Sequence, residues 1–515
     1  MINFCILSET RIPYVCPHNP TSQHSDIPTL HPVDQLIDIY QTRRGRSRLS
    51  QLPPGPFRIP IFGYMPFMAS NPQNALKKLA QRYGNVFTIY LGNYRVVVLN
   101  DYKTIKDAFK EDNFSGRPNL KMLEVRNQGV RRGLVCSEGR EWSEQRKFTL
   151  RQLKDLGLGK QSMDCLVHDE IDELVVGLKR DKLKSVNLQH RITTAVLNVI
   201  WRITCGERYT HDDYRMQILL EKTRADLAET QYTGPLLFLP WLINLAPRLT
   251  RWKEFVKSVD DVHSFLANII KSHKTTFNSQ IRRDFIDSYL AEVQRITDPE
   301  SSFYKSIGEH SLLVVLLDLF MAGADTTSTT LYWAFLYMVL YRDVQGKVQI
   351  EIDEIIGNET ACAEHRKKMP YTEATMMEIM RKSSLVPLGL FHNTMSDTEF
   401  AGYYIPKETV IAANLHIVHN SEKIWGDPQN FRPSRFLDAN NRIKKYDEFI
   451  PFSIGKRVCP GENLARDEFF LFFVGLLKHF SFYADPDKPS PSEVPNIGVI
   501  LSPKPYFVKA QVRKN

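Results

Sequence analysis

A long apolar segment from Leu312 to Tyr341 constrains the fold of this chain more than any other feature. As a helix it would be long enough to cross a bilayer. Asp318 and Asp325 would then lie two turns apart on one face, and several threonines follow Asp325 at once. Such groups are costly to place in lipid. The segment is therefore predicted to be the central helix of a large soluble core.

The composition supports a core of that size. The chain has 515 residues, of which 43% are hydrophobic and 11% aromatic, far from the composition of a disordered protein. Because no Gly/Ser tract or Pro-rich spacer marks a linker, we expect one large domain over residues 51–515. Residues 1–50 are more polar, end in a basic run, and are expected to be largely disordered.

Hydrophobic periodicity predicts a mainly α fold with a small β-sheet region. The segment Val86–Leu99 is typical of two strands joined at a Gly92–Asn93 turn. Residues 101–385 are mostly helical in pattern. Short strands and turns return between about 390 and 415, and a last apolar helix is expected over Glu462–Leu477.

Charge and cysteine content exclude some classes of function. The net charge of +9 comes from 67 basic and 58 acidic residues that are scattered along the chain. Nucleic acid is therefore not an expected partner, whereas an acidic protein or an anionic membrane surface fits such an excess. The seven cysteines form no CxxC pair or regular framework. This argues against a zinc site or a disulfide scaffold and favours a reducing compartment.

The segment Phe452–Gly461, FSIGKRVCPG, carries the most specific signal. Its glycines allow a tight turn close to a flat ligand, and Arg457 offers a cation for an anionic group. Cys459 precedes a predicted helix N-terminus, a position expected to favour the thiolate. A buried structural cysteine is the commoner role for a single Cys. However, five fixed residue types in ten positions should arise by chance only on the order of once in ten thousand such chains.

At these residues the chain resembles the cytochrome P-450 superfamily, over about residues 50–515. The nearest likeness is to the animal microsomal drug- and steroid-metabolising branch. The resemblance implies the single large P-450 fold and haem b as cofactor. It makes Cys459 the proximal iron ligand, in a loop that begins at Phe452 and ends at Gly461. A thiolate ligand favours cleavage of a bound O–O bond.

A second match is the AGADTT motif, Ala322–Thr327, in the long central helix. Gly323 would remove a side chain where oxygen must enter, while Asp325 and Thr326 would place an acid and a hydroxyl beside it. The resemblance gives Thr326 a role in protonating the oxygen under activation, with Asp325 passing protons from water. The alternative is that the threonines merely bond carbonyls of the preceding turn. The cysteine loop on the same chain favours the catalytic interpretation.

The third match joins Glu378-x-x-Arg381 to Arg435 in the segment FRPSRF. Residues spaced by three share a helix face, where an ion pair is commonplace and usually solvated. In the family, the matching residues form a buried network that holds the haem-loop region. The resemblance therefore gives Glu378, Arg381 and Arg435 a structural role.

Two further sets of residues follow from the resemblance. Residues expected to hold the haem propionates are Trp142, Arg146, Arg117, His392 and Arg457. Residues expected to line the substrate pocket are Val135, Cys136, Ala322, Val386, Leu390 and Leu501. Each of these side chains, taken alone, is also typical of an ordinary surface or core position. The second set implies an apolar substrate.

The reaction implied is monooxygenation of small apolar molecules of xenobiotic, steroid or fatty-acid type, by hydroxylation or epoxidation. Because no flavin or dinucleotide motif is visible, NADPH-derived electrons would come from a separate flavoprotein reductase, with a cytochrome b5-type protein as a second donor. Basic residues between Arg140 and Lys154 suit an acidic donor. Two alternatives stay open, a haem-thiolate peroxide isomerase or dehydratase and a non-catalytic haem sensor. The intact Asp325–Thr326 pair disfavours both.

The resemblance also implies the cytosolic face of the endoplasmic reticulum membrane. Residues 1–50 contain no run that could span a bilayer, unlike the anchor helix of that branch, so peripheral association is expected. Residues 234–243, GPLLFLPWLI, are followed by basic residues and are predicted to dip into the headgroup layer. Packing of this segment inside the fold is the alternative.

Overall fold

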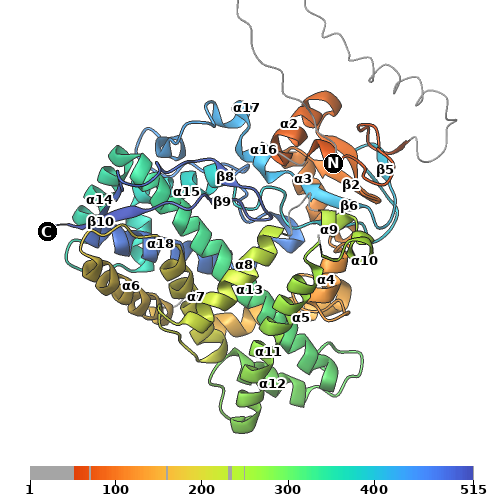
Figure 1. Ribbon diagram of the computed structural model, residues 1–515, viewed down its shortest axis with the longest axis horizontal. Helices are drawn as coiled ribbons and strands as arrows, with labels where there is room; N and C mark the ends of the chain where they lie inside the picture. Colours follow the sequence, from red (N-terminus) through yellow and green to blue (C-terminus); the bar gives the residue numbers. More distant parts are fainter. Residues whose placement is uncertain (1–50, 69–70, 158–160, 230–234, 249, 514–515) are drawn as a thin grey trace, which may run out of the picture. The chain divides into compact units, whose positions relative to one another are not determined.

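The central apolar segment forms one long helix, α13 (Lys305–Leu340). In Figure 1 it runs through the middle of the ribbon. Most of its side chains are buried, including Trp333 and Phe335. Among the residues that the structure describes, α13 is the one helix long and apolar enough to cross a membrane. Because other helices bury it on several sides, it is the core helix that the sequence predicts.

The structure is a computed structural model and describes residues 51–513 with four gaps. The gaps are 69–70, 158–160, 230–234 and 249. The predictions of disorder and of a basic membrane contact for residues 1–50 lie outside the described residues.

Helices make up most of the described chain, which confirms the predicted fold class. The helices other than α13 are α2 (Pro72–Tyr83), α3 (Tyr102–Lys110), α4 (Lys121–Arg126), α5 (Gly139–Asp155), α6 (Gln161–Asp181), α7 (Gln189–Cys205), α8 (Tyr214–Glu229), α9 (Pro235–Phe238), α10 (Leu242–Leu245), α11 (Trp252–Thr276), α12 (Phe285–Arg295), α14 (Arg342–Ile355), α15 (Pro370–Ser383), α16 (Leu415–His419), α17 (Glu422–Trp425) and α18 (Glu462–His479). Of these, α7, α11, α12, α15 and α18 pack against α13. Side chains of Asn71, Asp101 and Asp284 accept the N-capping bonds of α2, α3 and α12.

The strands are short and form small sheets. They are β1 (Val86–Leu91), β2 (Tyr94–Leu99), β3 (His392–Asn393), β4 (Thr398–Phe400), β5 (Tyr403–Ile405), β6 (Val410–Ala413), β7 (Phe480–Ala484), β8 (Pro495–Asn496), β9 (Ser502–Pro503) and β10 (Val508–Val512). Strands β1 and β2 pair antiparallel, with Leu91 opposite Tyr94, so the predicted hairpin turn at Gly92–Asn93 is confirmed. The four-stranded sheet has the order β1-β2-β6-β3.

The apolar segment that was predicted to dip into a headgroup layer lies partly inside the fold. Leu236, Leu237, Phe238 and Leu239 are buried and belong to the apolar core around β1 and β2. The prediction is therefore wrong for these four residues, because core side chains cover them. The end of the segment reaches the surface, where Trp241 is exposed.

Three charged side chains form ion pairs that join α15 to the segment around Arg435. Arg381 donates to both carboxylate oxygens of Glu378, from Nε to Oε2 at 2.7 Å and from Nη2 to Oε1 at 2.9 Å. Arg435 donates from Nε to Oε1 of the same carboxylate at 3.0 Å. Arg381 also donates to the carbonyls of His419, at 2.7 Å, and Pro428, at 2.9 Å. All three charged side chains are buried, so this is a closed core network and not a solvated surface pair.

Replacing Glu378 with glutamine should destabilise the fold strongly. Two buried guanidinium groups would lose their shared carboxylate, and breaking a buried pair in this way costs about 3–5 kcal/mol. The measurement is the urea midpoint of unfolding. The matched control is Arg295→Ala, which breaks a solvent-exposed pair with Glu292 three residues away and should leave the midpoint nearly unchanged. Equal midpoints for Glu378→Gln and the parent would contradict the structural role of the network.

Candidate functional site

The loop before α18 is held in shape by its own backbone. The Cys459 amide donates to the Phe452 carbonyl at 3.0 Å, and the Val458 amide donates to the Gly455 carbonyl at 3.1 Å. Gly455 has a φ of 77°, and a Cβ at this position would collide with the carbonyl oxygen of Phe109 in α3. Only glycine tolerates both conditions. The loop is thus pressed against α3 with Cys459 fixed at its far end.

Cys459 is half-buried and lies two residues before Gly461, the N-cap of α18. Burial raises the pKa of the thiol above its usual value, while the Gly461 amide and the Arg146 guanidinium act in the opposite direction. The Gly461 amide at the N-terminus of α18 thus favours the thiolate, in the expected direction, but burial of the thiol has the larger effect. A coordinated metal ion would deprotonate such a thiol outright.

Three arginines from distant parts of the chain gather beside this loop. The Arg457 guanidinium lies 4.0 Å from the ring centroid of Trp142 in α5, and Arg146 lies 5.8 Å from the same ring. Arg146 also donates to the Val458 carbonyl at 2.6 Å, next to Cys459. Arg117 is buried, and its Nη1 donates to the Phe391 carbonyl at 2.7 Å. The predicted propionate-binding residues are thus brought together.

The electrostatics of this cluster suit an anionic ligand. Burial, together with repulsion from Arg117 and Arg146, lowers the pKa of Arg457 to about 8, whereas Glu138 acts against this shift. His392 is buried, stacks on Phe109 at 3.8 Å between ring centroids, and its Nδ1 contacts the Phe114 carbonyl at 2.7 Å. Clustered guanidinium groups beside a thiol and an aromatic ring have the donor chemistry that haem, with its two propionates, requires. The residues present therefore fit this cofactor.

The threonine of the AGADTT motif uses its hydroxyl within the helix. Thr326 Oγ1 donates to the Ala322 carbonyl at 2.8 Å, and Thr330 Oγ1 donates to the Thr326 carbonyl at 2.9 Å. This is the bonding that the alternative interpretation predicted. Ala322 is exposed and Thr326 half-buried on the same helix face, while Asp325 is buried. The motif therefore presents a hydroxyl and an open apolar position side by side.

Gly323 does not have the expected surroundings. A Cβ at this position would lie 3.3 Å from Cγ2 of Ile200 in α7. The missing side chain thus faces the packed α7–α13 contact. Close helix packing therefore also accounts for the glycine, and the expectation that Gly323 opens a path for oxygen stays a prediction.

A buried ion pair that sequence reasoning missed fixes the segment before α5. Asp318 of α13 accepts from Arg126 Nη2 at 2.6 Å and from the backbone amides of Leu134, at 2.6 Å, and Val135, at 3.0 Å. The carboxylate is 2% exposed. An acid in an apolar helix was the only signal for Asp318 in the sequence. No pattern in the sequence indicated Arg126, which lies far from Asp318 in the chain.

The predicted pocket residues occupy different environments. Arg117 links two of them, since its Nε donates to the Val135 carbonyl at 3.0 Å and its Nη1 to the Leu390 carbonyl at 3.2 Å. Leu390 is 46% exposed. Leu501 is buried, and its amide donates to the Leu385 carbonyl at 2.8 Å, next to the half-buried Val386. Cys136 is buried, which raises the pKa of its thiol.

Comparison with known proteins agrees with this geometry. Residues 53–510 match the family model described as Cytochrome P450. Human cytochrome P450 2J2 is 37% identical over 471 residues, which cover 89% of this chain and 91% of that protein. Cytochrome P450 2L1 of Panulirus argus is 35% identical over 474 residues, covering 90% and 96%. Cytochrome P450 18a1 of Drosophila melanogaster is 32% identical over 478 residues, covering 90% and 88%. The chain therefore belongs to the cytochrome P450 family and is a haem monooxygenase.

Proposed function

We propose that Cys459 is the proximal ligand of haem b in a monooxygenase that hydroxylates or epoxidises small apolar substrates. Electrons come from NADPH through a separate flavoprotein reductase, with a cytochrome b5-type protein as a second donor. The observation that carries the proposal is the position of Cys459, at the N-terminus of α18 and beside the guanidinium groups of the half-buried Arg146 and the buried Arg457.

Residues of the chain itself bind the cofactor and contact the substrate. When bound, haem supplies the oxygen-activating chemistry. Arg117, Arg146 and Arg457 hold its propionates, and Trp142 stacks beneath two of these cations. The exposed Leu390 and the half-buried Val135 leave an apolar surface for substrate.

Thr326 positions the water that delivers the proton consumed in the reaction. Because its hydroxyl hydrogen is bonded to the Ala322 carbonyl, the oxygen is left as an acceptor for a proton-bearing water on the exposed helix face. Asp325, the residue before Thr326 in the chain, is the acid that supplies a new proton to this water. The buried position of Asp325 protects this route from bulk solvent.

The reductase binds the exposed basic face of α5. Lys147, Arg151 and Lys154 are exposed there, whereas Arg140 is already paired with Glu144 and Asp298. Arg146 on the same helix touches the carbonyl next to Cys459. An acidic donor that binds this face therefore comes close to the ligand cysteine.

Changing the ligand residue tests the central assignment. The reduced protein with carbon monoxide should show the red-shifted Soret band of thiolate ligation, and Cys459→His should abolish it because imidazole replaces sulfur. Cys136→Ala and Cys165→Ala are the matched controls and should keep the band. A normal band in Cys459→His would overturn the assignment.

Changing Thr326 tests proton delivery. Thr326→Ala should keep the carbon monoxide band and consume NADPH, yet yield severalfold less product and more hydrogen peroxide, because the proton arrives late. The control is Thr330→Ala, one turn further along α13, which should keep the parent's product yield per NADPH. Equal yields in Thr326→Ala and the parent would remove Thr326 from the mechanism. Turnover that needs no NADPH would instead favour the isomerase or dehydratase alternative.

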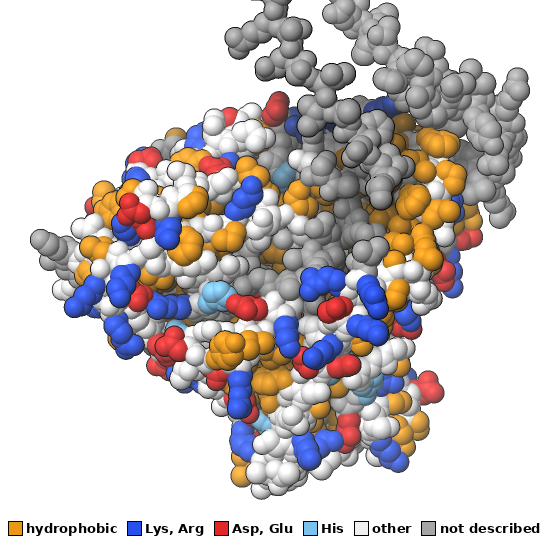
Figure 2. Space-filling view, in the orientation of Figure 1, with side chains coloured by type: hydrophobic (Ala, Val, Ile, Leu, Met, Phe, Trp, Pro, Cys, Tyr) orange, Lys and Arg blue, Asp and Glu red, His pale blue; other side chains and the backbone are white. Residues whose placement is uncertain are grey.

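We propose further that the protein works at the cytosolic face of the endoplasmic reticulum membrane. Two apolar segments meet at Gly92: its amide donates to the Phe62 carbonyl at 3.3 Å, and a Cβ on it would touch the carbonyl of the buried Phe238. Large apolar side chains are exposed on both segments, namely Ile61, Phe62, Phe67, Trp241 and Leu245. Figure 2 shows apolar side chains gathered over the part of the surface where Figure 1 labels β5 and α10. Such a patch is typical of a membrane contact.

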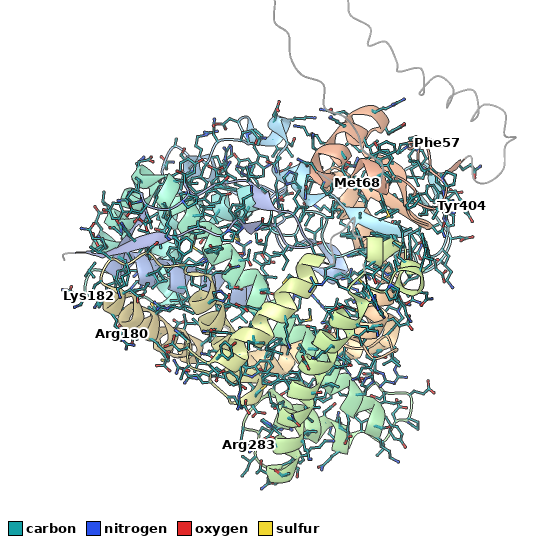
Figure 3. All side chains as sticks on the ribbon, in the orientation of Figure 1. Phe57, Met68, Arg180, Lys182, Arg283 and Tyr404 are labelled. Atoms are coloured by element: carbon teal, nitrogen blue, oxygen red, sulfur yellow. The ribbon has the colours of Figure 1, made fainter. Side chains whose placement is uncertain are left out.

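The double variant Trp241→Asp/Leu245→Asp should float less with anionic liposomes than the parent, because both side chains are exposed, at 38% and 72%. Leu237 is unsuitable for this test because it is buried. The control Ile281→Asp/Ile350→Asp adds the same charges at exposed apolar positions elsewhere; Figure 3 places Arg283, near Ile281 in the chain, far from Phe57. Undiminished flotation of a folded, haem-loaded Trp241→Asp/Leu245→Asp variant would show that this patch is not the contact.

A further inference from the structure

His419, the last residue of α16, joins two parts of the molecule that the sequence treats as separate motifs. Its carbonyl accepts a bond from Arg381 of the Glu378 network at 2.7 Å. Its imidazole Nε2 accepts a bond from the Ile450 backbone amide at 3.2 Å. The residue is 1% exposed. One buried histidine thus contacts the ion network with its backbone and the approach to the cysteine loop with its ring.

The bonding fixes the tautomer of this ring. Because a backbone amide can only donate, Nε2 must carry a lone pair and no hydrogen. The hydrogen then resides on Nδ1, which lies 3.4 Å from Ser384 Oγ. A second hydrogen, added to Nε2, would face the Ile450 N–H and remove the acceptor on which this amide depends.

Two backbone hydrogen bonds continue from Ile450 into the cysteine loop. The Ile450 carbonyl accepts from the Ser453 amide at 3.0 Å, and Phe452 accepts from the Cys459 amide at 3.0 Å. Ser453 has a φ of 62°, an unusual conformation for a residue other than glycine. The turn that carries Cys459 therefore begins at the amide that His419 holds.

We propose that His419 is the positioning residue through which the Glu378–Arg381–Arg435 network holds the Cys459 loop, and that protonation of its ring releases the loop in acid. This rests on the proposed role of Cys459 as the haem ligand. His419 touches neither the cofactor nor the substrate in this account. It acts through the Ile450 amide.

The charges around His419 make it resist protonation while the loop is closed. Burial lowers its pKa from 6.5 to about 3, and repulsion from Arg381 of α15 and from His416 on its own helix acts in the same direction. The segment opposite presents the Ile450 amide and the Phe449 ring, whose centroid lies 6.3 Å from that of the imidazole. No carboxylate is among the causes that shift this pKa.

The sign of the pH effect follows from the difference in the pKa of His419 between the closed and the released loop. A released His419 binds a proton near pH 6.5, whereas the closed state does not until about pH 3. The closed state therefore has its full advantage above pH 6.5 and loses it as the pH falls towards 3. Linkage then favours loop release by about 100-fold at pH 4.5 relative to neutral pH.

The test compares the haem-loaded parent with His419→Gln and His416→Gln between pH 7.5 and 4.5. The glutamine amide oxygen can accept the Ile450 N–H and does not titrate. His416 is the matched control: it is a second histidine of α16 whose pKa burial lowers to about 4, but its ring bonds to Asn420 in the same turn and not to the cysteine loop. The readout is the red-shifted Soret band of the reduced carbon monoxide complex, with far-UV circular dichroism to detect global unfolding.

We expect His419→Gln to keep the thiolate band to lower pH than the parent, while His416→Gln loses it together with the parent. Coincident pH profiles for all three proteins, or an equal shift in His416→Gln, would overturn the proposal. A parent without the thiolate band at pH 7.5 would instead contradict the ligand role of Cys459.

Hydrogen exchange in the parent decides the question if His419→Gln does not fold. The peptide that contains Ile450 should lose protection between pH 6.5 and 4.5, after correction for intrinsic exchange rates, while peptides of α13 stay protected. This measurement depends neither on the Soret band nor on catalytic activity. Protection of Ile450 that persists until the whole fold opens would refute the release of the loop.

Discussion

The carboxylate of Glu378 is the point on which the active-site side of the fold depends. It sits in the core with two guanidinium groups, and the Asp427 carboxylate, paired with Arg435, balances the second cation. These pairs persist only while α15 and the segment around Arg435 stay in place. A buried group of this kind is weak evidence for added stability, but removing one member leaves uncompensated charge. The network therefore holds α15 and the segment around Arg435 together. The remaining donors of Arg381 extend it to His419, beside the approach to the cysteine loop.

A second cluster of charge, which is only partly buried, has an excess of cations. Arg117, Arg146 and Arg457 repel one another, and Glu138 is the acid that opposes them at Arg457. A set of cations with this surplus suits an anionic ligand, whereas the Glu378 network is complete in itself. The Glu378 network reaches the approach to the cysteine loop through His419, whereas the arginine cluster lies beside Cys459.

Features with local sequence patterns could be predicted. The central helix, the β1–β2 hairpin and the cysteine loop all follow from spacing within short segments. Features that depend on distant partners could not. Arg126 binds Asp318 from far away in the chain, Gly323 faces Ile200 of another helix, and Leu237 is covered by residues of several segments. The effect of burial on the Cys459 thiol likewise depends on the whole fold, so the helix N-terminus alone did not reveal that burial opposes the thiolate.

Iron K-edge X-ray absorption of the purified ferric protein tests the account most directly, because it reports the atoms bound to the metal. The account predicts one sulfur atom in the first coordination shell, and its loss in Cys459→Ala when haem is retained. A first shell of nitrogen and oxygen atoms alone in the parent would contradict the assignment of Cys459.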